Sequence, residues 1–262
     1  MRTWMMITHL EDTESAAAIK RAYDFRFPSE VVIIVNASRT HCLGGWKTGA
    51  QAQEEKIAIK TNAVARMIDP QTMHPYKADH GAYPLDEFGV VVIKKVVVMR
   101  GPEAEGYPFL QRPFLVDLCL SAAYKNPHVG RDGALGMSHQ TGALVKLKQT
   151  LRAAIKRAEG QARPYLVITA WGCGAFGNPP EEIADMMATT LADAEFRYAF
   201  AGIIVPANDD HNSFHGNLAV FSQRLRPIAD EFNRDFVSNS WKAGPGLLFT
   251  REQNLRTQEI ID

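Results

Sequence analysis

The sequence predicts an α/β domain with three layers, in which helices cover both faces of a mixed central sheet. Short runs of apolar, β-branched residues alternate along the chain with segments whose apolar positions recur at helical spacing. The runs at 31–35 and 165–172 are almost continuously apolar, which is typical of strands covered on both faces. No internal repeat or low-complexity tract interrupts this alternation.

The spacing of apolar residues predicts the helices and strands of the first half of the chain. Residues 12–23 have a helical rhythm and predict an N-terminal helical segment ahead of the strand VVIIV (31–35). Residues 51–67 predict a helix, and its inward positions are expected to be Ala52, Ile57, Ile59, Ala63 and Met67. The runs at 90–99 and 114–123, joined by the turn-rich GPEAEGYP, predict two antiparallel or edge strands.

The second half repeats the alternation. Leucine and alanine recur at helical spacing from Leu144 to Ala158, and this helix is expected to have a solvated basic face. That face consists of Lys146, Lys148, Arg152 and Arg157. A strand at 165–172, a helix that starts at PPEEIADMM, a strand at 200–207 and a helix at SQRLRPIADEF complete the pattern. We expect one domain over 1–262, with a core at about 12–225 and a peripheral C-terminal extension, partly helical, at 226–262.

Composition narrows the class of protein. The chain has 262 residues, 46% of them hydrophobic and 22% charged, as in ordinary globular domains. The formal net charge is zero, which gives no electrostatic case for nucleic acid or an anionic membrane as the main partner. The three cysteines form no CxxC pair, and the start has no signal-like apolar segment, so we expect a cytoplasmic protein without disulfides.

Two loops that follow predicted buried strands hold the candidate functional residues. The first runs from Asn36 to Glu55 and contains Gly44 and Gly45, after which a helix begins with Gln53, Glu54 and Glu55. Glycines allow a backbone to approach a ligand closely, and the carboxylates suit acid–base chemistry. Acidic residues in a first helical turn are also favoured by the helix dipole alone, so this loop leaves the structural alternative open.

The second loop is AWGCGAFGNPP (170–180), with three glycines in six residues ahead of a helix start. Backbone N–H groups at such a position form a natural anion site, although a plain tight turn has the same composition. There is no Walker lysine, which disfavours a nucleoside-triphosphatase loop. Gly174 is expected to have a positive φ and to let the backbone approach a diphosphate. Together the loops suit the cleavage of a glycosidic bond on a sugar nucleotide.

The two loops resemble those of the microbial poly(ADP-ribose) glycohydrolases, which are macrodomains. The matching segments are GGWKTGAQAQEE (44–55) and the loop at 170–180, with weaker echoes in AYPL (82–85) and SAAYKNP (121–127). The resemblance covers roughly residues 12–225. It departs from the family pattern at Leu43, which occupies the first position of a usual triple glycine, and at Cys42, a position often held by proline.

The resemblance implies an enzyme that binds ADP-ribose, or an ADP-ribosylated macromolecule, and needs no cofactor. It assigns Glu55 as the general acid and base and Glu54 as the residue that positions the ribose. It places substrate contacts at the following residues: Asn36, Gly44, Gly45, Gln53, Gly172, Cys173, Gly174, Ala175, Phe176 and Gly177. Cys173 is expected to contribute its backbone N–H, and Phe176 either packs on the distal ribose or fills the core.

Two alternatives to this enzyme remain. The altered glycine at Leu43 fits a non-catalytic ADP-ribose reader, and the same site suits a hydrolase of mono-ADP-ribosylated side chains or nucleic-acid bases. His211 and His215, with Asp209 and Asp210, have a spacing that could bind a divalent ion. A polar loop explains the same residues, and the proposed chemistry requires no metal.

Overall fold

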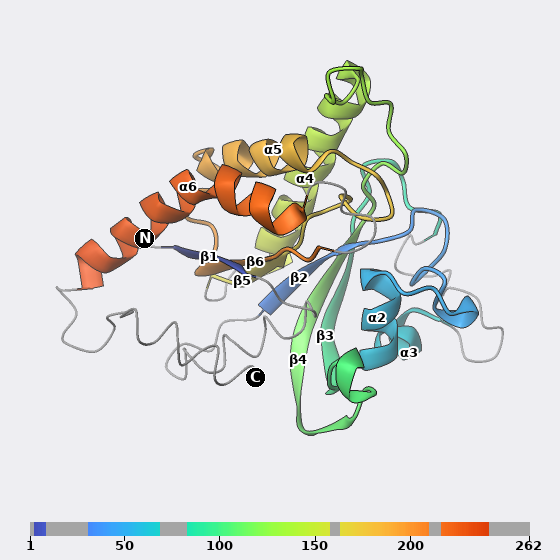
Figure 1. Cartoon of the computed structure of the whole chain (residues 1–262). Coiled ribbons are helices and arrows are strands. Elements are labelled where there is room, and N and C mark those ends of the chain that lie inside the picture. The colour runs from blue at the N-terminus through green and yellow to red at the C-terminus, as the bar shows by residue number, and fades with distance from the viewer. Residues whose placement is uncertain (1–2, 9–30, 69–82, 158–162, 210–215, 241–262) are drawn as a thin grey trace.

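The computed structural model describes residues 3–8, 31–68, 83–157, 163–209 and 216–240 (Figure 1). Six strands form one sheet in the order β1-β6-β5-β2-β4-β3. They are β1 (Trp4–Thr8), β2 (Val31–Asn36), β3 (Val91–Arg100), β4 (Phe109–Ser121), β5 (Tyr165–Ile168) and β6 (Gly202–Pro206). Neighbouring strands are parallel except for the antiparallel pair β3–β4, so the prediction of a mixed sheet is confirmed.

Helices cover both faces of this sheet, as Figure 1 shows. One face carries α4 (Met137–Arg157), α5 (Pro180–Ala192) and α6 (Asn217–Ser240), and the other carries α2 (Gln53–Lys60) and α3 (Ala63–Met67). Short 3₁₀ turns lie at η1 (Trp46–Thr48) and η2 (Glu103–Glu105). The three-layer prediction is therefore confirmed, while the helix expected at 12–23 lies outside the described residues.

The strands divide their side chains between two hydrophobic cores. On β4, Cys119 packs with α4, α5 and α6, whereas Leu118 and Leu120 pack with α2 and α3. The same alternation holds on β6, where Ile203 faces the first core and Ile204 the second. Successive side chains of a strand point to opposite faces, so continuous apolar runs are what a sheet covered on both faces requires.

Some elements extend beyond the core expected at 12–225. The strand β1 pairs with β6 along its whole length, although it precedes residue 12. The helix α6 continues to Ser240 and buries Phe232 completely. Pro227 lies inside α6, and a proline within a helical pattern reads in sequence as a helix end.

The helix predicted at 51–67 is in fact two helices, separated at Thr61 and Asn62. Ile57, Ala63 and Met67 are buried as expected, but Ala52 is exposed because it precedes the first turn of α2. Ile59 is half-buried. No helix in the described parts of the chain combines the length and apolarity that a membrane span requires.

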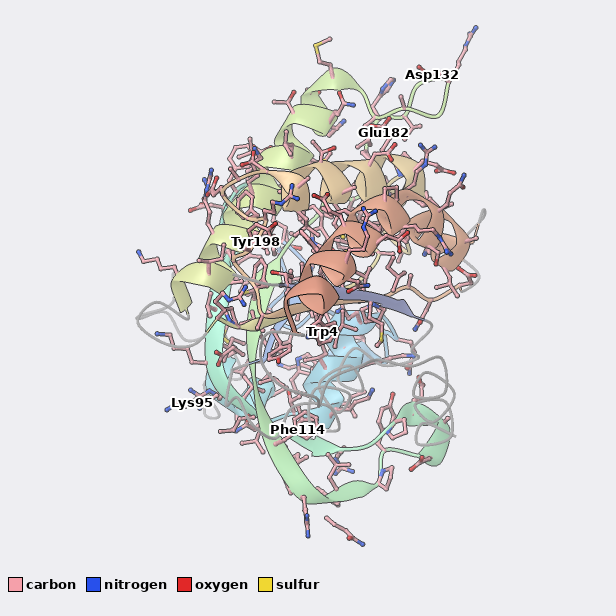
Figure 2. The ribbon with its side chains drawn as sticks, turned by 90° about the vertical axis from the view of Figure 1, so that its left-hand side faces the viewer. Trp4, Lys95, Phe114, Asp132, Glu182 and Tyr198 are labelled. Carbon is pink, nitrogen blue, oxygen red and sulfur yellow. The ribbon has the colours of Figure 1, made fainter. Side chains whose placement is uncertain are left out.

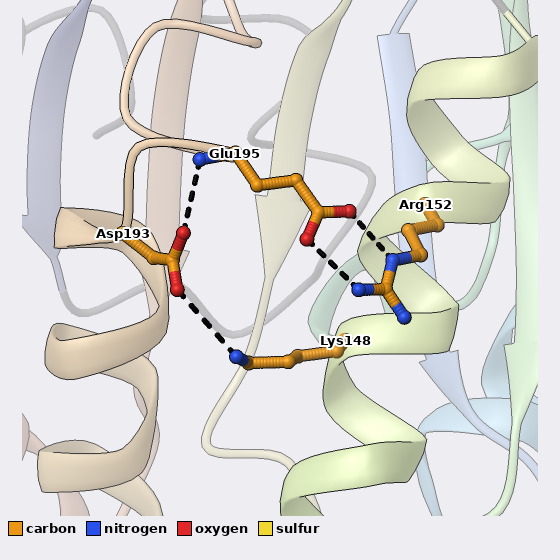
Figure 3. Close-up of polar contacts among 4 residues, drawn as sticks. All are labelled: Lys148, Arg152, Asp193 and Glu195. Atoms are coloured by element: carbon orange, nitrogen blue, oxygen red, sulfur yellow. Dashed lines mark hydrogen bonds and ion pairs between the residues drawn. The ribbon is translucent and has the colours of Figure 1, made fainter.

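The basic face of α4 is only partly solvated. Lys148 pairs with Asp193 at 3.5 Å, and Arg152 forms two hydrogen bonds of 2.5 and 2.8 Å with Glu195 (Figure 3). Solvent screens both pairs, so they contribute little to stability. Lys146 corrects the prediction, because it is buried beneath the segment that precedes β3.

The β3–β4 hairpin extends away from α5 and α6 at one end of the molecule, with α2 and α3 beside it (Figure 1). Figure 2 shows Lys95 and Phe114 of this hairpin at the opposite end from Asp132 and Glu182. The tip of the hairpin contacts α2 through an ion pair of 2.6 Å between Lys56 and Glu103. The antiparallel pair predicted at 90–99 and 114–123 is confirmed, and its distal end supports the helix that carries the two glutamates.

Candidate active site

The two loops that the sequence singles out leave neighbouring parallel strands at the same edge of the sheet. The first, residues 36–55, follows β2 and is called the glutamate loop below; the second, residues 170–180, follows β5 and is called the glycine loop. The glutamate loop leads to α2 on one face, and the glycine loop leads to α5 on the other. Adjacent strands whose connections diverge in this way leave a crevice at their carboxyl ends, where α/β proteins bind ligands.

Polar side chains fix the start of α2 against the sheet. The backbone N–H of Asn36 donates to Gln53 Oε1 at 3.1 Å, and Asn36 Oδ1 accepts from the N–H of Ala123 at 3.1 Å. These bonds connect β2 to the first turn of α2 and to the end of β4. The predicted contacts of Asn36 and Gln53 with a substrate stay predictions, since the bonds found for both side chains are structural.

Glu54 and Glu55 are both buried in that first turn, at 3% and 6% exposure. Glu54 Oε2 accepts the N–H of Ser38 at 2.6 Å, and Glu55 Oε1 accepts the N–H of Gly45 at 2.7 Å. The second oxygen of each carboxyl is buried without a hydrogen bond. Buried acceptors normally have partners, so these two oxygens are available to a bound molecule.

Gly44 lies where the two carboxyls converge. Its φ is +64°, and a β-carbon at this position would collide with the Glu55 carboxylate and lie 3.1 Å from Glu54 Oε2. Both the left-handed backbone and the close approach require glycine. The sequence-based interpretation of Gly44 as a point of close backbone approach fits this geometry, with the carboxylates themselves as the nearest atoms.

Leu43 is left-handed as well, with a φ of +58°, yet it carries a large side chain. That side chain is fully buried and packs in the core between α2 and the sheet. The departure from a triple glycine therefore changes the core, and the leucine does not project into the crevice. Its burial stabilises a backbone conformation that costs a non-glycine residue about 1–2 kcal/mol.

The electrostatics of the site centre on Glu54. Burial, reinforced by the negative charge of Glu55, raises the pKa of Glu54 to about 8, while the N–H groups of Ser38 and Leu43 and the hydroxyl of Tyr83 act in the opposite direction. Glu54 thus retains its proton through much of the neutral range. A buried carboxyl that keeps its proton at neutral pH, beside a second buried carboxyl, is suited to acid–base work.

The glycine loop is held from within, but part of its backbone has no partner. The N–H of Cys173 donates to Ala170 O at 3.0 Å, and the N–H of Gly177 donates to Gly174 O at 2.8 Å. Between them, the N–H groups of Gly174, Ala175 and Phe176 find no acceptor among the described residues. Three successive donors ahead of a helix start form a site for an anion.

Positive φ occurs at Gly172 (+79°) and Gly177 (+69°), whereas Gly174, where it was expected, has none. A β-carbon on Gly172 would lie 2.6 Å from Ala123 Cβ, so this glycine is required by packing against the end of β4. Among the described residues, and apart from its two chain neighbours, no atom lies within 4 Å of a β-carbon built on Gly174. Gly174 therefore faces open space, which fits the approach of a ligand.

Asn178 connects the glycine loop to the segment after β4. Its Nδ2 donates to Tyr124 O at 2.7 Å and to Gly172 O at 3.0 Å, and the side chain is almost completely buried. The N–H of Asn126 donates to Phe176 O at 2.8 Å across the same boundary. Sequence reasoning missed Asn178 as a site residue, although its place directly after Gly177 was a usable signal.

Cys173 and Phe176 have structural roles in this loop. Burial raises the pKa of the Cys173 thiol, so the nucleophilic thiolate does not form at neutral pH. Phe176 is half-buried and packs on the core beneath the loop. Of the two roles foreseen for Phe176, core packing is found, and contact with a ribose stays a prediction.

A metal site has no support in the described part of the chain. No group of three histidine, cysteine, aspartate or glutamate side chains gathers there in a way that would hold an ion. His211 and His215, whose spacing suggested a metal, lie outside the described residues. Asp209 accepts the N–H of Leu218 at the start of α6, a structural role.

Residues 5–101 match a family model described as the microbial-type PARG catalytic domain. These residues include the whole glutamate loop, whereas the glycine loop lies beyond them. A comparison with curated proteins gave no match.

Solved structures resemble most of the chain. Poly(ADP-ribose) glycohydrolase from Thermomonospora curvata is 28% identical, with a TM-score of 0.66 over 86% of this chain and 77% of that one. The same enzyme bound to the inhibitor ADP-HPD is 27% identical, with a TM-score of 0.66 over 85% and 79%. The Deinococcus radiodurans enzyme in complex with ADP-ribose is 23% identical, with a TM-score of 0.66 over 86% and 85%. The chain thus shares the fold of solved poly(ADP-ribose) glycohydrolases, and its glutamate loop lies within the match to the microbial-type PARG catalytic domain.

Proposed function

We propose that this chain is an ADP-ribose-binding glycohydrolase that cleaves O-glycosidic ADP-ribosyl linkages and releases ADP-ribose. The observation that carries the proposal is the placement of two buried glutamates and three unpartnered backbone donors at the ends of neighbouring strands. The match of residues 5–101 and the ADP-ribose bound to a structural relative support it. We further propose that the three-layer arrangement is that of a macrodomain.

The glycine loop would bind the diphosphate. An anion is the ligand expected for three successive unpartnered N–H groups, those of Gly174, Ala175 and Phe176. The N-terminus of α5 follows within a few residues and also favours negative charge. The open face of Gly174 gives the diphosphate room to reach the backbone. Binding at this loop would place the adjoining ribose toward the neighbouring glutamate loop.

Glu55 would then act as the general acid. It protonates the leaving oxygen as the bond to the anomeric carbon of the ribose breaks, and an oxocarbenium-like centre develops on the sugar. The nearby diphosphate stabilises that positive charge. The ionised Glu55 next accepts a proton from water, which attacks the anomeric carbon and restores the acid.

Glu54 would position the ribose. Its Oε1 is buried and accepts no hydrogen bond, so it is free to contact a ribose hydroxyl. The two carboxyls belong to successive residues of a helix and accept different backbone N–H groups, so they serve different roles. Because the acid step needs a proton on the pair, activity is expected to fall at high pH, as Glu54 ionises.

The non-catalytic reader loses its main support in this geometry. That alternative depended on Leu43 obstructing the pocket, but the leucine side chain is fully buried in the core. The decisive experiment incubates the protein with poly(ADP-ribose) and, separately, with mono-ADP-ribosylated protein and nucleic acid, and measures free ADP-ribose by chromatography. Release from none of these substrates, by a protein that still binds ADP-ribose, would leave the reader as the function.

A further inference from the structure

A segment that sequence reasoning treated as a weak echo lies against the glutamate loop. This segment consists of residues 83–89 and is called the strap below. The N–H of Leu85 donates to Arg39 O at 2.7 Å, and Arg39 Nε donates to Leu85 O at 3.1 Å. Leu85 is almost completely buried, which fixes this end of the strap to the protein.

The other end of the strap is fixed by β4 and α4. Tyr124, just after β4, donates its hydroxyl to Glu87 Oε1 at 2.5 Å. Lys146 on α4 donates to the backbone carbonyl of Glu87 and lies over the rings of Tyr124 and Phe88, at 4.7 and 5.6 Å. A buried lysine is costly unless it is paired, so its burial indicates that the strap has a defined position.

This position places Tyr83 beside Glu54. The Tyr83 hydroxyl and Glu54 Oε1 are both buried, and neither forms an aligned hydrogen bond. They are nevertheless close enough for the phenol to stabilise the ionised carboxyl. Leaving a hydroxyl buried without a partner costs free energy, so a phenylalanine would be the more stable residue at a purely structural position.

We propose that Tyr83 is a positioning residue of the reaction, whose hydroxyl orients Glu54 and supports its ionised form during turnover. The inference deepens the proposed glycohydrolase function, on which its kinetic readout depends. The strap is fixed at Leu85 against Arg39, next to the residue whose N–H binds Glu54, and it brings the phenol close to the Glu54 carboxyl. Glu54 Oε2 accepts the Ser38 N–H, and the phenol lies near the same carboxyl.

The other ionisable groups that face Glu54 do not supply this support. Glu55 opposes the ionisation of Glu54, because two like charges would then lie side by side. Burial raises the pKa of the Cys42 thiol to about 12, so it stays uncharged at neutral pH. Burial and the Glu54 charge raise the pKa of Tyr83 above its ordinary range, which keeps the phenol a hydrogen-bond donor.

The first test compares Tyr83→Phe with the wild type in the pH profile of kcat/KM. Loss of the phenol removes a group that lowers the pKa of Glu54, so the alkaline limb moves upward, by about half to one pH unit. Tyr107→Phe is the matched control, because it also removes a buried hydroxyl without a hydrogen bond, but beside the hairpin tip. An alkaline limb that stays in place in Tyr83→Phe, or moves equally in Tyr107→Phe, overturns the inference.

The second test does not depend on turnover. Carbon-13 NMR of labelled glutamate carboxyls follows the titration of Glu54 directly, with Glu54→Gln used for assignment. Tyr83→Phe should raise its midpoint, and replacement of tyrosine by the more acidic 3-fluorotyrosine should lower it without changing the fold. An unchanged midpoint in both samples overturns the inference even if the enzyme is active, whereas shifted midpoints in a protein that releases no ADP-ribose would contradict only the proposed function.

Discussion

The glutamate loop and the glycine loop leave neighbouring strands, but they use their backbone donors in opposite ways. In the glutamate loop, the N–H groups of Ser38 and Gly45 donate to the protein's own carboxylates. In the glycine loop, three successive N–H groups have no acceptor within the described chain. The first loop is therefore organised to hold an acid before any ligand arrives, and the second is complementary to an anion that the chain does not itself provide.

The largest expected effect is the loss of catalysis when the acid of the glutamate loop is replaced and the glycine loop is left intact. Glu55→Gln is nearly isosteric but cannot transfer a proton, so the release of ADP-ribose should fall by about 10²–10⁴-fold. Affinity for ADP-ribose, measured by calorimetry, should change little, because the diphosphate contacts lie on the other loop. Glu54→Gln should reduce the rate less, since its role is to position the ribose.

The outcome of this pair of variants also decides the roles of the two glutamates. If Glu54→Gln is inactive and Glu55→Gln turns over normally, the acid is Glu54. That result would agree with the raised pKa of Glu54, about 8, which already gives this carboxyl a proton to donate at neutral pH.

The sequence predicts the strands and both loops because their signals are local. The runs at 31–35 and 165–172 need burial on both faces, and an amphipathic spacing such as that of Leu147 and Leu151 specifies the buried side of α4. Glu54, Glu55 and the glycines could be identified because their chemistry and their place after strands stand in adjacent residues. The position of both loops at one sheet edge then follows from the parallel order of β2 and β5.

What the sequence could not predict depends on contacts between distant segments. Lys146 has the spacing of a solvated residue, and only the strap, nearly sixty residues earlier, makes it a buried one. Tyr83 lies near Glu54 because it belongs to the same strap, and no periodic pattern in the sequence predicts the position of the strap. In the sequence, Leu43 stands out only as a departure from a triple glycine, and neither its burial in the core nor its left-handed φ could be predicted from that departure.

The next effect tests whether Leu43 serves the core. Leu43→Gly removes a fully buried side chain, which costs about 2–5 kcal/mol, and relieves a left-handed strain of about 1–2 kcal/mol. Chemical denaturation should therefore show a net loss of about 0–4 kcal/mol in the free energy of unfolding. Leu43→Ala keeps the strain and should be less stable than Leu43→Gly by about 1 kcal/mol. A Leu43→Gly variant more stable than the wild type would mean that the leucine is not a core residue.

Binding of ADP-ribose at the glycine loop should change the free energy of unfolding by a comparable amount. ADP-ribose at one hundred times its dissociation constant should stabilise the native state by about 2.7 kcal/mol, because it binds only the folded chain. For a domain of this size, the midpoint of thermal unfolding should rise by roughly 5–10 °C. Adenosine at the same concentration lacks the diphosphate and should raise it much less. Equal shifts with both ligands would show that the diphosphate contributes nothing at this loop.

The smallest expected effect comes from a substitution that distinguishes a glycine facing open space, Gly174, from a glycine required by packing, Gly172. Gly174→Val places a branched side chain in the open space through which the diphosphate would reach the backbone. The valine itself would meet no atom of the described residues beyond its chain neighbours, so the fold should tolerate it. The affinity for ADP-ribose should fall by about tenfold, or about 1.4 kcal/mol, with the unfolding midpoint unchanged. Gly172→Val is the matched variant: its side chain would collide with Ala123 and Asn178 at a φ of +79°, so it should lower stability whether or not ligand is present. Loss of stability in both variants, with unaltered affinity in folded Gly174→Val, would reduce the glycine loop to a tight turn and remove the contrast with the glutamate loop.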